Sequence, residues 1–261
     1  MNWLRVFFVG GLTSFRALFG WLNPYIYVPM LVITPLFQML FFAYLGRTSH
    51  AESDAYFVVG NAFVAASLPG LWGTGWGIAG ERRTQTLGTL LSSPASRLAL
   101  FLGRAVPPIA NGFVVGAFCF ATGRLLLHFD PPLSALSGLA LATLLAAFSC
   151  SALGLSIGAI GLRGRNVTAL NNIALIVFLI FTGANVPLQR LPGWIQAISP
   201  YLPLTHGIEA AREILAGASI HQAGHLLLAE LAVGVAYTLV GAIALKLFEF
   251  ESRRSASLET F

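Results

Sequence analysis

Few residues in this chain could carry out chemistry by themselves. The one hydrolase-like pattern, Gly-x-Ser-x-Gly around Ser156, needs a strand–turn–helix context, but it lies in a long apolar segment that we predict to be a membrane helix. There is no His-Glu-x-x-His or Cys-x-x-Cys pattern for a metal, and Cys119 and Cys150 lie in apolar segments as small hydrophobic residues. There is also no Gly-x-x-x-x-Gly-Lys-Ser/Thr loop for nucleotide phosphates, and Lys246 is the only lysine. We therefore predict that the chain is not an enzyme and binds no metal or cofactor of its own.

Ionisable residues deep in a bilayer would indicate an ion pathway, and this sequence has very few of them. The exception is Glu230, about one and a half turns into the last apolar segment. We expect it to pair with an arginine such as Arg212 or Arg124, and a substrate-sensing role is the alternative. Because no series of carboxylates could couple protons or sodium to transport, energy for any uphill movement must come from elsewhere.

One polar stretch, residues 80–94, interrupts the apolar chain. It has three charged residues, then three leucines at helical spacing, then a proline: Glu81, Arg82, Arg83, Leu87, Leu90, Leu91 and Pro94. We expect Gly80 to break the preceding helix, so that Glu81 begins a new one, where the helix dipole favours negative charge. The leucines would form one apolar face. That face could rest on lipid, or it could dock on a cytosolic ATPase.

Composition decides the class of fold. Of 261 residues, 56% are hydrophobic and 10% charged, whereas soluble domains carry about 25% charged residues. A helix needs ~20 mostly apolar residues to cross a bilayer. Six segments meet that requirement: 25–46, 56–79, 100–127, 133–160, 168–186 and 225–247.

The remaining segments are of other kinds. Residues 2–22 are predicted to form an amphipathic helix in the membrane interface, with aromatic residues toward lipid. Prolines interrupt 187–224, which predicts two short helices, about 191–198 and 204–216, dipping into the outer leaflet. Residues 248–261 form a polar tail. Gly70 to Gly77 mixes glycine with bulky residues, which favours close helix packing over a substrate contact.

The basic residues are distributed unevenly. The pI is near 9.7, and eleven of the fifteen basic residues fall on the side that we assign to the cytoplasm: Arg5, Arg16, Arg82, Arg83, Arg97, Arg104, Arg163, Arg165, Lys246, Arg253 and Arg254. The other side receives Arg47, Arg124, Arg190 and Arg212. This asymmetry follows the positive-inside rule and places both termini in the cytoplasm, so the charge indicates orientation and not nucleic-acid binding.

Two regions of the sequence together resemble one known family of membrane proteins. Glu81, Arg82, Thr86, Leu87, Leu90 and Pro94 are similar to its cytoplasmic loop. The region after the fifth span is similar to its paired outer re-entrant helices, through Gly183, Pro187-Leu188, Leu191-Pro192, Trp194, Ser199-Pro200, Pro203-Leu204-Thr205 and Ala211-Arg212. The family is that of the ABC type-2 exporter permeases, and the resemblance covers nearly the whole chain. It implies an all-α polytopic membrane protein forming one transmembrane domain, with an interfacial helix, six spans, a coupling helix over 81–94 and two re-entrant helices.

The resemblance also implies partners. The permease would work as two copies, most simply a homodimer, with two copies of a separate P-loop ATPase that holds ATP and magnesium. Contacts to that ATPase would come from Glu81, Arg82, Arg83, Thr86, Leu87, Leu90, Leu91 and Pro94. The expected location is the bacterial cytoplasmic membrane, in contact with lipid.

The first and fifth spans would line the transport pathway between the two copies. The candidate lining residues are Tyr25, Phe37, Phe41, Tyr44, Asn61, Asn171, Asn172, Phe178, Phe181 and Asn185. A lining of aromatic rings and amides suits an amphiphile, such as a drug-like natural product, a lipid or a lipo-oligosaccharide. Export of a lipid-linked polysaccharide is the alternative, and an ATP-independent channel is another.

Overall fold

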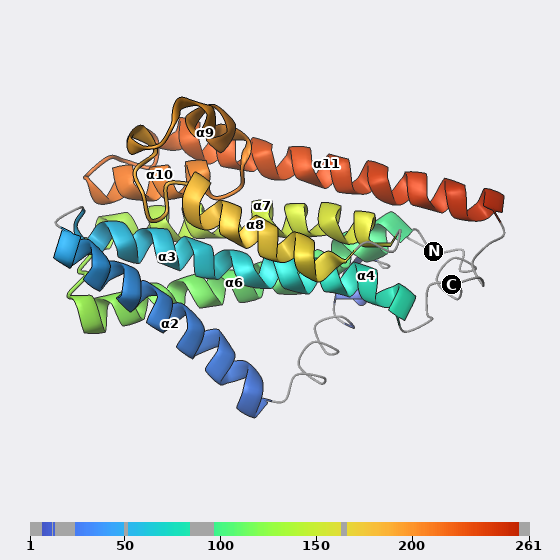
Figure 1. Ribbon diagram of the computed structural model, residues 1–261, viewed down its shortest axis with the longest axis horizontal. Helices are drawn as coiled ribbons and strands as arrows, with labels where there is room; N and C mark the ends of the chain where they lie inside the picture. The colour runs from blue at the N-terminus through green and yellow to red at the C-terminus, as the bar shows by residue number, and fades with distance from the viewer. Residues whose placement is uncertain are drawn as a thin grey trace.

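The computed structural model describes residues 7–11, 13, 24–49, 52–83, 97–162 and 166–255, and most of these residues are helical (Figure 1). In chain order the helical elements are α2 (Pro24–Ser49), α3 (Asp54–Leu68), the π-helix η1 (Pro69–Thr74), α4 (Gly75–Arg83), α6 (Arg97–Leu127), α7 (Leu133–Gly161), α8 (Val167–Phe181), η2 (Leu188–Arg190), α9 (Gly193–Ile198), η3 (Ser199–Tyr201), α10 (Thr205–Leu215) and α11 (Gly224–Ser255). No strand occurs in these ranges. The all-helical class predicted from composition is confirmed.

Four helical stretches within the described residues are long and apolar enough to cross a membrane. They are Asp54–Gly80, Ala99–Leu127, Leu133–Gly161 and Gly224–Phe248. The apolar helix α8 has 15 residues and is shorter than this requirement. The structure thus agrees with a multi-pass membrane protein, and the six-span topology stays a prediction.

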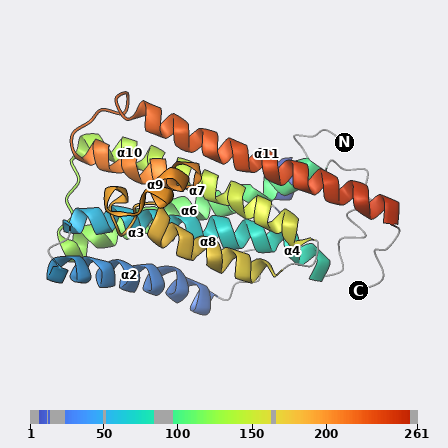
Figure 2. The same cartoon turned by 45° about the horizontal axis from the view of Figure 1, so that its top comes forward.

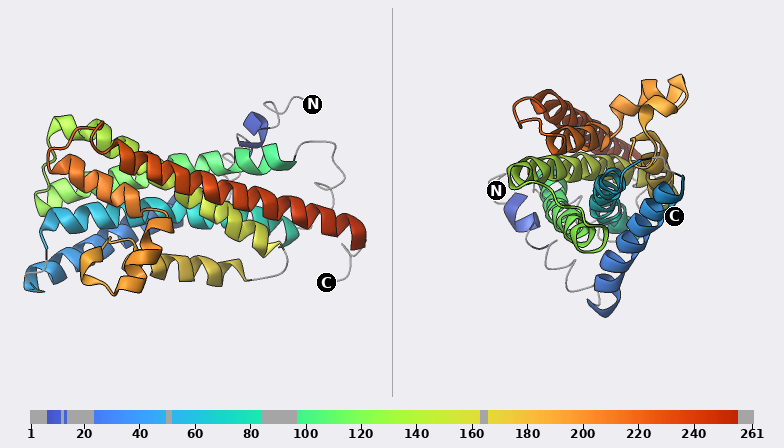
Figure 3. Two further views of the ribbon diagram at one scale, coloured as in Figure 1. Left: turned by 90° about the horizontal axis from the view of Figure 1, so that it is seen from above. Right: turned by 90° about the vertical axis from the view of Figure 1, so that its left-hand side faces the viewer.

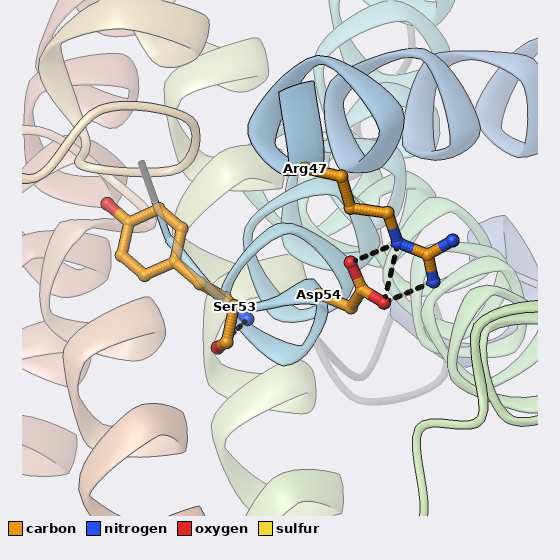
Figure 4. A network of polar contacts seen from close by, with 4 residues as sticks. Arg47, Ser53 and Asp54 are labelled. Atoms are coloured by element: carbon orange, nitrogen blue, oxygen red, sulfur yellow. Dashed lines mark hydrogen bonds and ion pairs between the residues drawn. The ribbon is translucent and has the colours of Figure 1, made fainter. Parts of the chain in front are cut away.

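Polar contacts join the end of α2 to the start of α3, at the end of the bundle that we predict to face outward (Figure 4). The Ser53 Oγ accepts a 3.3 Å hydrogen bond from the Tyr56 backbone N–H and caps α3. Arg47, in the last turn of α2, donates through Nε to Asp54 Oδ1 at 2.9 Å. A serine cap and an acidic first turn both stabilise a helix N-terminus, so α3 begins at Asp54.

One continuous helical rod is formed by α3, η1 and α4. It runs through Gly80 and ends at Arg83, so the predicted break at Gly80 is wrong, and Glu81 lies near the end of a helix and not at its start. A glycine inside a helix costs only about 1 kcal/mol relative to alanine, which is too little to end a helix by itself. The irregularity of this rod lies elsewhere, in the π-helical turn that begins at Pro69.

The central helix of the bundle is α7. It packs against α11 on one side and against α6, α3 and η1 on the other (Figure 3). Its buried positions are mostly small residues, such as Ala142, Ala146, Ser149, Gly154 and Gly158. Small side chains let neighbouring helices approach closely, which suits the central position of α7. Figures 1 and 2 show α2 and α11 at opposite edges of this arrangement.

The end of α8 differs from the prediction. The helix begins after Asn166, whose Oδ1 caps the Ala169 N–H at 3.3 Å, and it ends at Phe181 instead of residue 186. Gly183 follows with a φ of +75°, a conformation that glycine adopts without strain and that stops a helix. The two short helices predicted before the last span are present as α9 and α10.

Candidate functional site

Arg212 on α10 joins three parts of the chain at the predicted outer end. Its guanidinium donates to the carbonyls of Gly183 at 2.9 Å, Ala184 at 3.2 Å and Tyr56 at 3.2 Å. The carbon at its centre lies 3.5 Å from the centre of the Tyr56 ring, and the Tyr56 hydroxyl donates to the Gly183 carbonyl at 2.7 Å. Burial lowers the pKa of Arg212, and nearby Tyr56 acts in the opposite direction. A planar guanidinium with five donors suits such a cluster of carbonyls.

Glu230 on α11 binds the other end of α10. Its Oε1 accepts hydrogen bonds from the Leu204 N–H at 3.0 Å and from Ser149 Oγ, and its Oε2 accepts one from the Gly207 N–H at 3.0 Å. Its side chain is fully buried. Leu204 itself gives α10 no side-chain cap. The first N–H groups of a helix need acceptors and favour negative charge, so Glu230 acts as the cap of α10 from another helix.

The prediction that Glu230 pairs with an arginine is therefore wrong. Arg212 binds backbone carbonyls, and Arg124 forms a 2.9 Å ion pair with Asp130. The start of α10 has no side-chain cap of its own, so its backbone N–H groups donate to the Glu230 carboxylate. These hydrogen bonds satisfy the buried carboxylate without an arginine beside it. A sequence signal did exist: position 204, just before the helix, is leucine and not Ser, Thr, Asp or Asn.

A third polar group links α2 and α3 to the segment after α8. The Asn61 Nδ2 donates to Asn185 Oδ1 at 2.9 Å and to the Phe57 carbonyl at 2.9 Å. Gln38 on α2, which the sequence did not single out, donates to Asn61 Oδ1 at 3.1 Å. We call Arg212, Glu230, Asn61 and their bonded partners the outer polar network. It holds α10 and the α8–η2 segment against α2, α3, α7 and α11.

The predicted lining residues of α2 lie on an exposed surface. Tyr25, Phe37, Phe41 and Tyr44 are 87, 65, 62 and 55% exposed. Positions 37, 41 and 44 follow the i, i+4, i+7 spacing of one helix face. Such a row of large apolar side chains on one face indicates a surface that contacts lipid or another protein.

The predicted lining residues of α8 and its neighbours divide into two sets. Asn172 is exposed on α8, and Phe181 is half-buried and packs edge-to-face on Trp194 with ring centres 5.6 Å apart. Four others are buried inside the chain: Asn61, Asn171, Phe178 and Asn185. Asn61 and Asn185 are thus in contact with each other, but both are buried inside the bundle and do not line an exposed surface. Figures 1 and 3 show α2 and α8 on the same side of the bundle.

Most of the predicted ATPase contacts lie outside the described residues. These are Thr86, Leu87, Leu90, Leu91 and Pro94. Glu81, Arg82 and Arg83 form the last turn of α4, which continues the rod of α3 and η1. Of the predicted interfacial helix 2–22, only residues 7–11 and 13 are described, and they are helical. Within the described ranges no group of three or more His, Cys, Asp or Glu could hold a metal.

A comparison with known protein families identifies one match. Residues 12–216 match the family model described as ABC-2 type transporter, which is more than three quarters of the chain. The match includes α2, the α3–η1–α4 rod, α8 and α10. No curated protein matches the chain.

Proposed function

Because the chain belongs to the ABC-2 type transporter family, whose members are the membrane components of transporters, we propose that it is the permease subunit of an ATP-driven exporter. The observation that carries the proposal is the exposed aromatic face of α2, on the same side of the bundle as the exposed face of α8. In a polytopic membrane protein such a side is suited to a second copy of the chain, with the transported molecule between the copies.

A separate P-loop ATPase, in two copies, supplies the energy in this proposal, with ATP and magnesium bound there. The sequence has no phosphate-binding loop, so hydrolysis must take place on a partner. The described part of α4 leads directly into residues 84–96, where the predicted contacts to that partner lie. Movement of the ATPase would therefore reach the bundle through the α3–η1–α4 rod.

The proposed cargo is an amphiphile, moved out across the bacterial cytoplasmic membrane, with both termini of the permease in the cytoplasm. The proposed lining now centres on the exposed side chains Tyr25, Phe37, Phe41, Tyr44 and Asn172, since four of the earlier candidates are buried. Aromatic rings accept apolar groups, and an amide can hydrogen-bond a polar head. A drug-like natural product or a lipid fits this combination better than a long glycan.

The test is transport by the complete complex. The permease is co-expressed with a candidate P-loop ATPase subunit, purified, and reconstituted into vesicles with fluorescent amphiphiles. We expect the two proteins to purify together and uptake into inside-out vesicles to require ATP and magnesium. Ion conductance by the permease alone, without ATP, would instead identify a channel, and movement only of lipid-linked glycans would identify the polysaccharide alternative.

Variants at the end of α4 test the coupling role. We expect Glu81→Ala and Arg82→Ala each to lower ATP-dependent transport about tenfold, because a hydrogen bond to a charged group contributes about 1.5–3 kcal/mol. Membrane insertion and thermal stability should not change, since both residues lie in the last turn of a helix.

The matched control is Arg124→Ala at the opposite end of the chain's bundle. It removes an exposed ion pair to Asp130, which is worth about 0–1 kcal/mol. Transport by this variant should stay at the wild-type rate. Unchanged transport by both Glu81→Ala and Arg82→Ala would show that these residues do not carry the coupling.

A further inference from the structure

The π-helix η1 divides the α3–η1–α4 rod into two halves with different surroundings. Above it, α3 is held by the outer polar network through Tyr56 and Asn61. Below it, α4 places Ile78 in a second, smaller apolar cluster with Phe101 and Leu155, apart from the main core. A π-helical turn inside an α-helix is rare, and such turns occur often at functional sites.

The π-helical turn has a local cause. Pro69 at its start has no N–H and crowds the carbonyl one turn earlier, which disturbs the regular hydrogen-bond ladder. Where the turn ends, the Gly75 N–H lies within hydrogen-bond distance of the carbonyls of both Leu71 and Trp72. A donor shared between two carbonyls is common where one helix type ends and another begins.

At two positions the contact of η1 and the start of α4 with α7 is backbone against glycine. A Cβ added to Gly154 of α7 would lie 2.5 Å from the Gly70 carbonyl oxygen, and one added to Gly158 would lie 2.9 Å from that of Gly75. Glycines on both helices remove the ridges that would lock them together. The close approach predicted for this Gly-rich segment is thus present.

Buried polar groups beside this turn have no partner in the protein. The Asn171 side chain is fully buried on α8, and neither its Oδ1 nor its Nδ2 makes a hydrogen bond. The Thr74 Oγ1, at the end of η1, and the Ser151 Oγ are likewise buried without partners. Asn171 faces the helix junction, since a Cβ on Gly75 would lie 3.3 Å from its Nδ2. A Cβ on Gly70, at the other end of the turn, would lie 2.7 Å from the Ser151 Oγ. Buried polar groups are nearly always hydrogen-bonded, so unpartnered groups at both ends of η1 call for an explanation.

We propose that the Pro69–Thr74 turn is the hinge of the rod, and that Asn171 and Thr74 become hydrogen-bonded in a second conformation in which α4 is tilted relative to α3. The amide and hydroxyl are unsatisfied here because their partners arrive only after the tilt. As a transport step, this inference rests on the proposed function, in which α4 receives the motion of an ATPase. The two-state hinge itself is a property of the chain alone.

The experiment removes the polar groups without changing shape. Asn171→Leu places methyl groups where the amide atoms lie, and Thr74→Val replaces the hydroxyl by a methyl. Both variants lose a group that is unsatisfied only in the present conformation. We expect their melting temperature in detergent to rise by roughly 2–4 °C, and their ATP-dependent transport to fall at least tenfold.

A distance measurement follows the hinge without any ATPase. Spin labels are placed at Gly80, where a Cβ would meet nothing within 4 Å, and at Ile160 on α7, which is 37% exposed, in a chain whose Cys119 and Cys150 are alanine. A tilt of about 20° acting over ~9 Å of helix moves Gly80 by about 3 Å. We expect two distances in the wild-type permease in lipid nanodiscs and one in Asn171→Leu and Thr74→Val. A reference pair at Glu52 and Leu133 should give one distance throughout.

Thr143→Val is the matched control, because the buried Thr143 hydroxyl already donates to the Leu139 carbonyl at 2.7 Å. It should lower the melting temperature slightly and leave both distances in place. The hinge proposal is overturned if the wild type and Asn171→Leu give the same distance distribution, or if removing the amide lowers stability. Absence of ATP-dependent transport in the wild type would contradict the proposed function and would not alter the distance result.

Discussion

Glu230→Ala is expected to cause one of the largest losses of stability of any single substitution in this chain. The variant removes the acceptor for two backbone N–H groups and for the Ser149 hydroxyl, all of them buried. Each buried donor left without a partner costs about 1–3 kcal/mol. The Ser149 hydroxyl can still donate to the Ala146 carbonyl at 3.0 Å, so the two backbone donors give a total of about 2–6 kcal/mol. That corresponds to a fall of about 10 °C in melting temperature for a chain of this size. Fluorescence-detected thermal unfolding in detergent measures it.

Two further variants separate the role of the cap from that of its charge. Glu230→Gln keeps one acceptor oxygen for the start of α10 and should lose about 1–2 kcal/mol, the cost of one missing hydrogen bond. Glu209→Gln, on the exposed side of α10, should leave the melting temperature unchanged. Equal stability of Glu230→Ala and the wild type would show that the carboxylate does not hold α10.

We expect Arg212→Ala to lower the free energy of unfolding about as much as Glu230→Ala does, for a different reason. It leaves the carbonyls of Gly183, Ala184 and Tyr56 without their guanidinium donor, and it removes a cation from the face of the Tyr56 ring. Such a desolvated cation–π contact alone contributes about 2 kcal/mol. We expect a total loss of about 3–5 kcal/mol and, because α10 is freed from α3 and α8, transport below detection.

Conservative variants at the same cluster test the geometry. Arg212→Lys keeps the charge but offers one donor group instead of a planar fork, so it should recover only part of the stability. Tyr56→Phe keeps the ring and loses the 2.7 Å bond to Gly183, a change of about 1 kcal/mol. A lysine variant as stable as the wild type would mean that charge alone is sufficient.

The helical class and the two short helices before α11 could be predicted from the sequence, because they depend on local properties. Apolar length and proline spacing act over neighbouring residues, and α9 and α10 follow them closely. The end of α8 was also encoded locally, since Gly183 adopts a positive φ that stops the helix, but the apolar residues beyond it concealed that signal.

The partner of Glu230 could not be predicted, because capping by another helix depends on how two distant segments meet. The same holds for the burial of Asn171 and Phe178 on α8: a polar or aromatic residue type does not tell which side of a helix faces the bundle. The π-helix has a proline as its visible cause, yet proline in a membrane helix more often gives a simple kink. In each case the outcome depends on tertiary packing, which the residue type alone does not determine.

The position of Glu230 in the chain sets an order for synthesis. The carboxylate lies 26 residues after Leu204, the first backbone group that it binds. At roughly 5–20 residues per second, translation takes about one to five seconds to cover that interval. During this time the start of α10 emerges from the ribosome without its acceptor, while α7 and Ser149 are already present. The outer polar network is therefore completed last, when α11 has been synthesised. In a nascent chain that stops before α11, α10 lacks its cap and is open to proteolytic quality control.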